Sequence, residues 1–213
     1  MVARITDQPV VSPTAKPAWW AILNLLITLY GVVFKGWGLQ PVVFIFWVEV
    51  IYSVIAALIR VVGAMDDRPF LDTIGQKIVF LFGGAALGVA FIMLSVTFTI
   101  GAFEGGFQTS DFAGIRNQVL LVALNYGAAL LIHYFLSGRF RHANPAGELI
   151  PTFVHLLVLL VFIMVITMHL LPRFPSLNHA LWAGLAVLLV KFAVDWMFSG
   201  LGRKLPQTFG LGS

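Results

Sequence analysis

The chain has 213 residues, of which 60% are hydrophobic and only 10% are charged. A soluble domain carries about 25% charged residues, so this composition excludes an ordinary soluble domain and indicates a polytopic membrane protein. The formal net charge of +4 is then a signal of membrane orientation, and the scattered basic residues predict no nucleic-acid surface. The absence of cysteine excludes a disulfide framework, a thiolate nucleophile and a cysteine metal site.

Six apolar stretches are each long enough to cross a bilayer as a helix, which requires about 20 residues. In chain order they lie at roughly 18–35, 41–62, 77–102, 117–137, 149–171 and 179–199. Because hydrocarbon offers the backbone no hydrogen-bond partner, each span is expected to be a helix. The predicted fold is all-α, a polytopic transmembrane bundle of six helices at 17–200, with a flexible cytoplasmic tail at 1–16 and a short one at 201–213.

The first predicted helix follows basic residues, as the apolar part of a signal peptide does. Its apolar run from Trp19 to Phe34 continues into Lys35 without a small-x-small cleavage site. We therefore expect an uncleaved transmembrane helix.

The second predicted helix carries one carboxylate, Glu49, in the middle of its apolar run. A charge at the centre of a membrane helix costs about 2.5–3.5 kcal/mol on insertion scales, so Glu49 requires a partner, a proton or a wet cavity. Ser53, Ala56 and Arg60 follow on the same helix face, which we expect to look into the bundle. Glu49 is interpreted as a proton or cation site, and the alternative is a buried structural carboxyl.

The third predicted helix contains Gly84-x-x-x-Gly88, a motif for close helix packing. Ser95 and Thr99 continue this stripe of small residues. Packing is the main interpretation of the stripe, and a narrow wet path along it is the alternative.

Two histidines lie where the fourth helix ends and the fifth begins. His133 and His155 are both expected toward the cytoplasm, bordering the mouth of a polar cavity. The dipeptide Asn144-Pro145 between them is typical of a helix start. No pair of histidines has a tight metal spacing such as His-x-x-x-His, so we predict no metal site and no haem or other cofactor.

The sixth predicted helix supplies the best partner for Glu49. Lys191 and Asp195 are four residues apart and therefore share a face. We expect a network of Glu49, Lys191 and Asp195 that joins the second helix to the sixth. The alternative is that Lys191 and Asp195 pair only with each other.

Three short motifs stand out: Gly36-Trp37 after the first predicted helix, Phe46-Trp47-x-Glu49 in the second and Lys191-x-x-x-Asp195 in the last. These motifs resemble those of a family of small bacterial integral membrane proteins, the domain of unknown function 6498. The resemblance covers about residues 18–200 and implies a six-helix prokaryotic membrane protein. It places Trp47, Glu49, Lys191 and Asp195 at the family's characteristic positions and implies no activity.

The function expected from these residues is binding or transport of a small solute, a proton or an ion. The candidate residues are Glu49, Lys191, Asp195, Ser53, His155 and His133. The alternative is a structural or accessory subunit of a membrane complex, in which the cluster only fixes helix packing. An enzyme is the weaker class, because the sequence has no P-loop, no Gly-x-Ser-x-Gly and no His-Glu-x-x-His motif. The expected partner is the lipid bilayer, with another membrane subunit or a homo-oligomer left open and no nucleic acid.

The basic residues predict the orientation of the chain. With six spans, one side holds nine of them: Arg4, Lys16, Arg60, Arg68, Lys77, Arg139, Arg141, Arg203 and Lys204. The other side holds three: Lys35, Arg116 and Arg173. Because basic loops stay in the cytoplasm, both termini are predicted to be cytoplasmic in a bacterial inner membrane.

A reporter fused after Ser213 tests this orientation. An enzyme that is active only in the cytoplasm should be active at that position, because the basic side of the protein is retained there. An enzyme that is active only outside the cytoplasm should be inactive in the same fusion. The opposite pattern would contradict the predicted topology.

Overall fold

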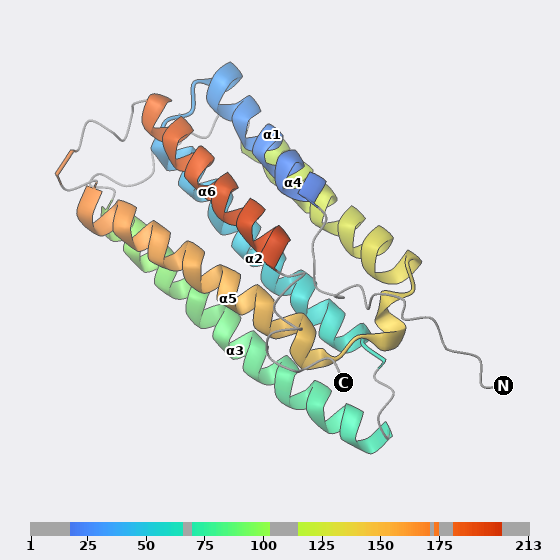
Figure 1. Cartoon of the computed structure of the whole chain (residues 1–213). Helices are drawn as coiled ribbons and strands as arrows, with labels where there is room; N and C mark the ends of the chain where they lie inside the picture. The colour runs from blue at the N-terminus through green and yellow to red at the C-terminus, as the bar shows by residue number, and fades with distance from the viewer. Residues whose placement is uncertain (1–17, 66–69, 103–114, 171–172, 175–180, 202–213) are drawn as a thin grey trace.

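The computed structural model describes residues 18–65, 70–102, 115–170, 173–174 and 181–201. Within these residues the chain forms six α-helices and no β-strand (Figure 1). The helices are α1 (Ala18–Lys35), α2 (Leu39–Gly63), α3 (Phe70–Ala102), α4 (Ile115–Ala129), α5 (Pro145–Val165) and α6 (Leu181–Leu201). Further helical segments are η2 (Leu130–Leu136) and η4 (Ile166–Leu170), which are π-helical and prolong α4 and α5, and the 3₁₀ turn η3 (Arg139–His142). The predicted all-α bundle of six helices is confirmed.

Four helical stretches are long and apolar enough to cross a membrane, judged by length and composition. They are Leu39–Gly63, Ile74–Thr97, Ile115–Leu136 and Pro145–Val165. A shorter apolar helix runs from Trp20 to Lys35. Helices of this kind are compatible with an integral membrane protein.

The start of α3 differs most from the predicted spans. This helix begins at Phe70, whereas the apolar pattern predicted a start at residue 77. Residues 70–76 mix apolar with polar side chains and therefore do not continue the apolar run that marks the predicted span. The tails predicted at 1–16 and 201–213 lie outside the described residues, apart from Leu201 at the end of α6.

The start of α5 is encoded locally. The side chain of Asn144 accepts a hydrogen bond from the backbone N–H of Ala146 at 2.9 Å. Pro145 occupies the first helical position, where a missing N–H costs no helical hydrogen bond. The predicted helix start is confirmed, and it fixes where His155 lies along α5.

The helix α2 is the centre of the structure. It packs against α3 and α5 on one side and against α4 and α6 on the other, and α1 packs against α4 and α6 (Figure 1). It buries 15 of its 25 residues, as expected for a helix with neighbours on both sides. The bundle therefore consists of a four-helix group (α1, α2, α4 and α6) and a three-helix group (α2, α3 and α5) that share α2.

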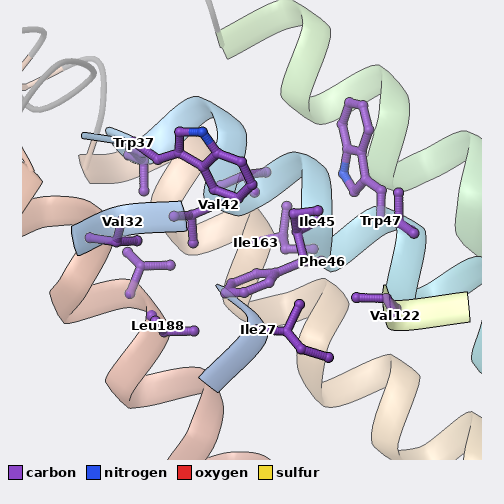
Figure 2. Packing of buried hydrophobic residues seen from close by; sticks show 14 of the residues in the cluster. Ile27, Val32, Trp37, Val42, Ile45, Phe46, Trp47, Val122, Ile163 and Leu188 are labelled. Carbon is purple, nitrogen blue, oxygen red and sulfur yellow. The ribbon is translucent and has the colours of Figure 1, made fainter. Parts of the chain in front are cut away.

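The largest apolar cluster fills the half of the bundle in which α2 begins (Figure 2). Phe46 of α2 is only 1% exposed, and it lies with Ile27 of α1, Val122 of α4, Ile163 of α5 and Leu188 of α6 in this cluster. Five helices thus contribute to one close-packed core. This core is one boundary of the polar site described below.

The glycine motif of α3 lies against α2 and α5, as the packing interpretation predicts. A Cβ added to Gly88 would lie 2.5 Å from Val54 of α2, and one added to Gly84 would lie 3.0 Å from Leu149 of α5. The neighbouring Gly83 has nothing within 4 Å of such a Cβ. The motif therefore lets α3 approach its neighbours closely, whereas Gly83 faces outward.

Substituting Gly88 and Gly83 with alanine separates the effect of close packing from the effect of helix propensity. Gly88→Ala should destabilise the protein by about 1–3 kcal/mol, because the β-branched, buried Val54 has no room to move away. Gly83→Ala is the matched control and should be neutral or slightly stabilising. Thermal denaturation in detergent measures both. Equal effects of the two substitutions would contradict the close approach at Gly88.

Candidate functional site

Lys191 lies between two carboxylates in the interior of the bundle. Its Nζ is 2.6 Å from Oε2 of Glu49 on α2 and 2.5 Å from Oδ2 of Asp195 on its own helix. The side chains of Lys191, Glu49 and Asp195 are 3%, 5% and 11% exposed. The structure therefore brings together the three residues expected to meet, and Lys191 contacts both carboxylates rather than only one.

The ring of Phe46 gives Lys191 an additional contact. The Nζ of Lys191 lies 5.2 Å from the ring centroid, within the range of a cation–π interaction. Phe46 and Glu49 are three residues apart on α2, so one helix face presents both the ring and the carboxylate. The ammonium group thus sits where the apolar core meets the polar site.

His155 connects α5 to this cluster. Its Nε2 lies 2.8 Å from Oδ1 of Asp195, so the two oxygens of this carboxylate contact two different helices. His155 was predicted to border a polar cavity at the cytoplasmic end of the bundle. The structure places it in direct contact with the ionic cluster, and its position at the mouth of a cavity stays a prediction.

Two asparagines that were not among the candidate site residues extend the cluster to α1 and α4. The side-chain amide of Asn24 donates to Glu49 Oε2 at 3.3 Å, and that of Asn125 donates to Asn24 Oδ1 at 2.6 Å. Both residues are buried. An amide in an apolar helix was the only signal that could have indicated them, because a buried polar group requires a hydrogen-bond partner.

Six residues from five helices thus form one connected set, which we call the polar network. Its members are Asn24, Glu49, Asn125, His155, Lys191 and Asp195. Every member can donate or accept a proton in a hydrogen bond. Among the described residues, no three His, Asp or Glu side chains gather closely enough to hold a metal ion.

Ser53 lies beside the polar network and bonds to Tyr126. The two hydroxyl oxygens are 2.8 Å apart. The ring of Tyr126 contacts Trp20 edge-on and stacks near Tyr52, with centroid distances of 5.0 Å and 6.2 Å. These three aromatic rings cover the network between α1, α2 and α4.

A second ion pair lies farther along α2. Arg60 was expected on the face of Glu49, and the structure pairs it with Glu148 of α5 at 3.3 Å between Nε and Oε2. Its Nη2 also donates to Thr152 Oγ1 at 3.2 Å. The positive charge of Arg139 also acts on Glu148, so this site has at least as many cations as carboxylates.

His133 lies at the level of this second pair. It belongs to the π-helical segment η2, and the next residue, Tyr134, donates its hydroxyl to the backbone carbonyl of Arg60 at 2.5 Å. A π-helix has more residues per turn than an α-helix, so the end of the fourth span is rotated relative to the α-helical pattern. The candidate residue His133 is therefore close to Arg60 in depth, whereas His155 belongs to the polar network.

The comparisons with known proteins give one match. Over residues 9–208 the chain matches the model of a family of unknown function, DUF6498. The chain belongs to this family. No curated protein and no solved structure shows a match. Membership in DUF6498 confirms the resemblance seen in the motifs, and because the family has no recorded activity, the function must be argued from the geometry of this DUF6498 chain.

The charge count of the network predicts that substitutions of its members differ in how much they destabilise the protein. Lys191→Met leaves two buried carboxylates without a cation and should destabilise the protein by about 3–5 kcal/mol. Glu49→Gln leaves the balanced pair of Lys191 and Asp195 and should cost much less. Lys35→Met, at an exposed position, is the control for loss of a lysine. Unfolding in a denaturing detergent measures all three, and an equal cost for Lys191→Met and Glu49→Gln would contradict the shared ammonium.

Proposed function

We propose that this DUF6498 protein is an integral membrane protein that binds and releases a proton in its polar network. The observation that supports the proposal is the ratio of charges at Lys191. One ammonium contacts two carboxylates, and none of the three side chains is more than 11% exposed.

The charge ratio makes an additional proton necessary. When Glu49, Lys191 and Asp195 are all ionised, two negative charges and one positive charge leave one net negative charge in the bundle. An isolated charge in an apolar environment costs several kcal/mol, so a buried cluster is stable when its net charge is zero. One more proton achieves this, on either carboxylate or on the imidazole of His155. The bound proton is then the ligand of the site.

The contacts of the network allow this proton to be shared. His155, Asp195, Lys191 and Glu49 follow one another at contact distances of 2.8, 2.5 and 2.6 Å. Each of the four side chains is titratable, so a proton can be redistributed among them by small movements. Asn24 and Asn125 are not titratable and orient Glu49 instead.

The burial of the same cluster favours a second candidate, a purely structural role. Lys191 and Glu49 are 3% and 5% exposed, and the network joins α1, α2, α4, α5 and α6. In a structural subunit, the network would keep one fixed protonation state and only hold the helices in register. The two candidates therefore differ in whether the network exchanges a proton with the solution.

Infrared difference spectroscopy across a pH titration distinguishes them. The wild type should show one buried group that changes its protonation, and this signal should be lost in Asp195→Asn, which makes the cluster neutral without an added proton. Glu148→Gln is the matched control, because Glu148 is buried but balanced by Arg60, so the signal should persist. Identical titrations of the wild type and Asp195→Asn would reject proton binding and leave the structural role.

A further inference from the structure

We infer that the polar network is open toward only one side of the membrane and that its proton arrives through His155 from the side on which α5 begins. This inference rests on the proposed function and adds the direction of access and the residue at which access occurs. Three features of the structure support it: the exposure of the members, their depth and the packing around them.

Exposure within the network rises toward His155. The side chains of His155 and Asp195 are 13% and 11% exposed, whereas those of Lys191 and Glu49 are 3% and 5% exposed. The network therefore has an outer end at His155 and an inner end at Glu49. An imidazole suits the outer position, because it can take a proton on one ring nitrogen and release one from the other.

The depth of each network member along its helix indicates the direction of proton access. His155 lies ten residues after Pro145, at which α5 begins, and Asp195 lies six residues before Leu201, at which α6 ends. At 1.5 Å per residue these separations are about 15 Å and about 9 Å. Glu49 lies 14 residues before Gly63, at which α2 ends, which is about 21 Å by the same rise. By these separations His155 and Asp195 lie nearer the end of the bundle where α5 begins, and Glu49 lies deepest. That end is the predicted cytoplasmic side.

The apolar core blocks access to the network from the opposite end of the bundle, where α2 begins. Leu39, Val42, Val43 and Ile45 lie between Glu49 and the start of α2, and all four are 0% exposed. Figure 2 shows the side chains of Val42 and Ile45 packed with Trp37 and Phe46 in this half of the bundle. Between the buried Gln40, in the first turn of α2, and Glu49, a proton would have to cross about 14 Å of close-packed apolar side chains to leave this way.

The remaining flank of the network is covered by aromatic rings. The ring of Tyr126 from α4 contacts both Trp20 from α1 and Tyr52 from α2. The groups that face Asp195 are Lys191 from α6, His155 from α5, and more distantly Glu49 from α2 and Tyr126 from α4. From α1, the network receives only the neutral Asn24. Among the titratable members, His155 is therefore the one placed to receive a proton from outside the network.

Cysteine accessibility tests the direction, since the natural chain contains no cysteine. Single variants in sealed vesicles of known orientation are exposed to a charged, membrane-impermeant thiol reagent added to one side. His155→Cys should be labelled from the side where α5 begins and not from the other, and the buried Val43→Cys should be labelled from neither. Arg141→Cys and Lys35→Cys, at exposed positions beyond the two ends of the bundle, mark the two faces.

Labelling of His155→Cys from the opposite side, or from neither side, would overturn the inference. Labelling of Val43→Cys from the side where α2 begins would overturn it too, because the apolar core would then admit water.

The wild-type protein provides a second test that needs no substitution. In the same vesicles, the pH is changed on one side only while the infrared signal of the network is followed. The signal should follow the pH on the side where α5 begins and ignore the other side. A signal that follows the opposite side overturns the direction of access alone, whereas a wild type that takes up no proton overturns the proposed function itself.

Discussion

One buried ammonium group holds two carboxylates, and the arrangement of five helices depends on this interaction. Lys191 forms an ion pair with Glu49 from α2 and with Asp195 from α6, and Asp195 also contacts the imidazole of His155. The other helices are attached through these carboxylates. α5 reaches Asp195 through His155, and α1 and α4 reach Glu49 through the two asparagines. Since an unpaired buried charge costs more than most packing defects, the ammonium fixes the relative rotation of these helices.

The helix α2 takes part in two ionic sites that differ in their ratio of cations to carboxylates. Glu148 pairs with Arg60 and also lies near the positive charge of Arg139, and Arg60 donates to Thr152 and accepts from Tyr134 of η2 through its backbone carbonyl. Such a pair needs nothing from the solution and ties α2 to α5. The network around Lys191 has one carboxylate more than it has ammonium groups. A pair that only joined two helices would not need this excess, which is why proton binding is the better account of the network.

The sequence predicted the parts of the site that carry charge and missed the parts that do not. Glu49, Lys191 and Asp195 could be selected because a charge in an apolar span is rare and demands a partner. The asparagines could not be ranked in advance, since one amide in a helix does not show which neighbour it will face. The six helices followed from apolar length alone, whereas the early start of α3 at Phe70 lies in a stretch of mixed polar and apolar residues. The position of His133 depended on the π-helical segment η2, which shifts the register of a helix without a sequence signature.

The two charged residues of α2 also constrain how the protein is made. Translation produces α2 early, but Glu148 and Lys191, which neutralise Arg60 and Glu49, lie on α5 and α6 and emerge from the ribosome last. An unpaired charge at the centre of a helix, such as that of Glu49, adds about 2.5–3.5 kcal/mol to its insertion into lipid, whereas Arg60 in the last turn of α2 costs less. The nascent chain therefore benefits from keeping α2 beside the insertion machinery, or shielded by α1 and α3, until the C-terminal helices arrive. The most buried helix of the finished bundle is thus the one whose membrane integration is completed late.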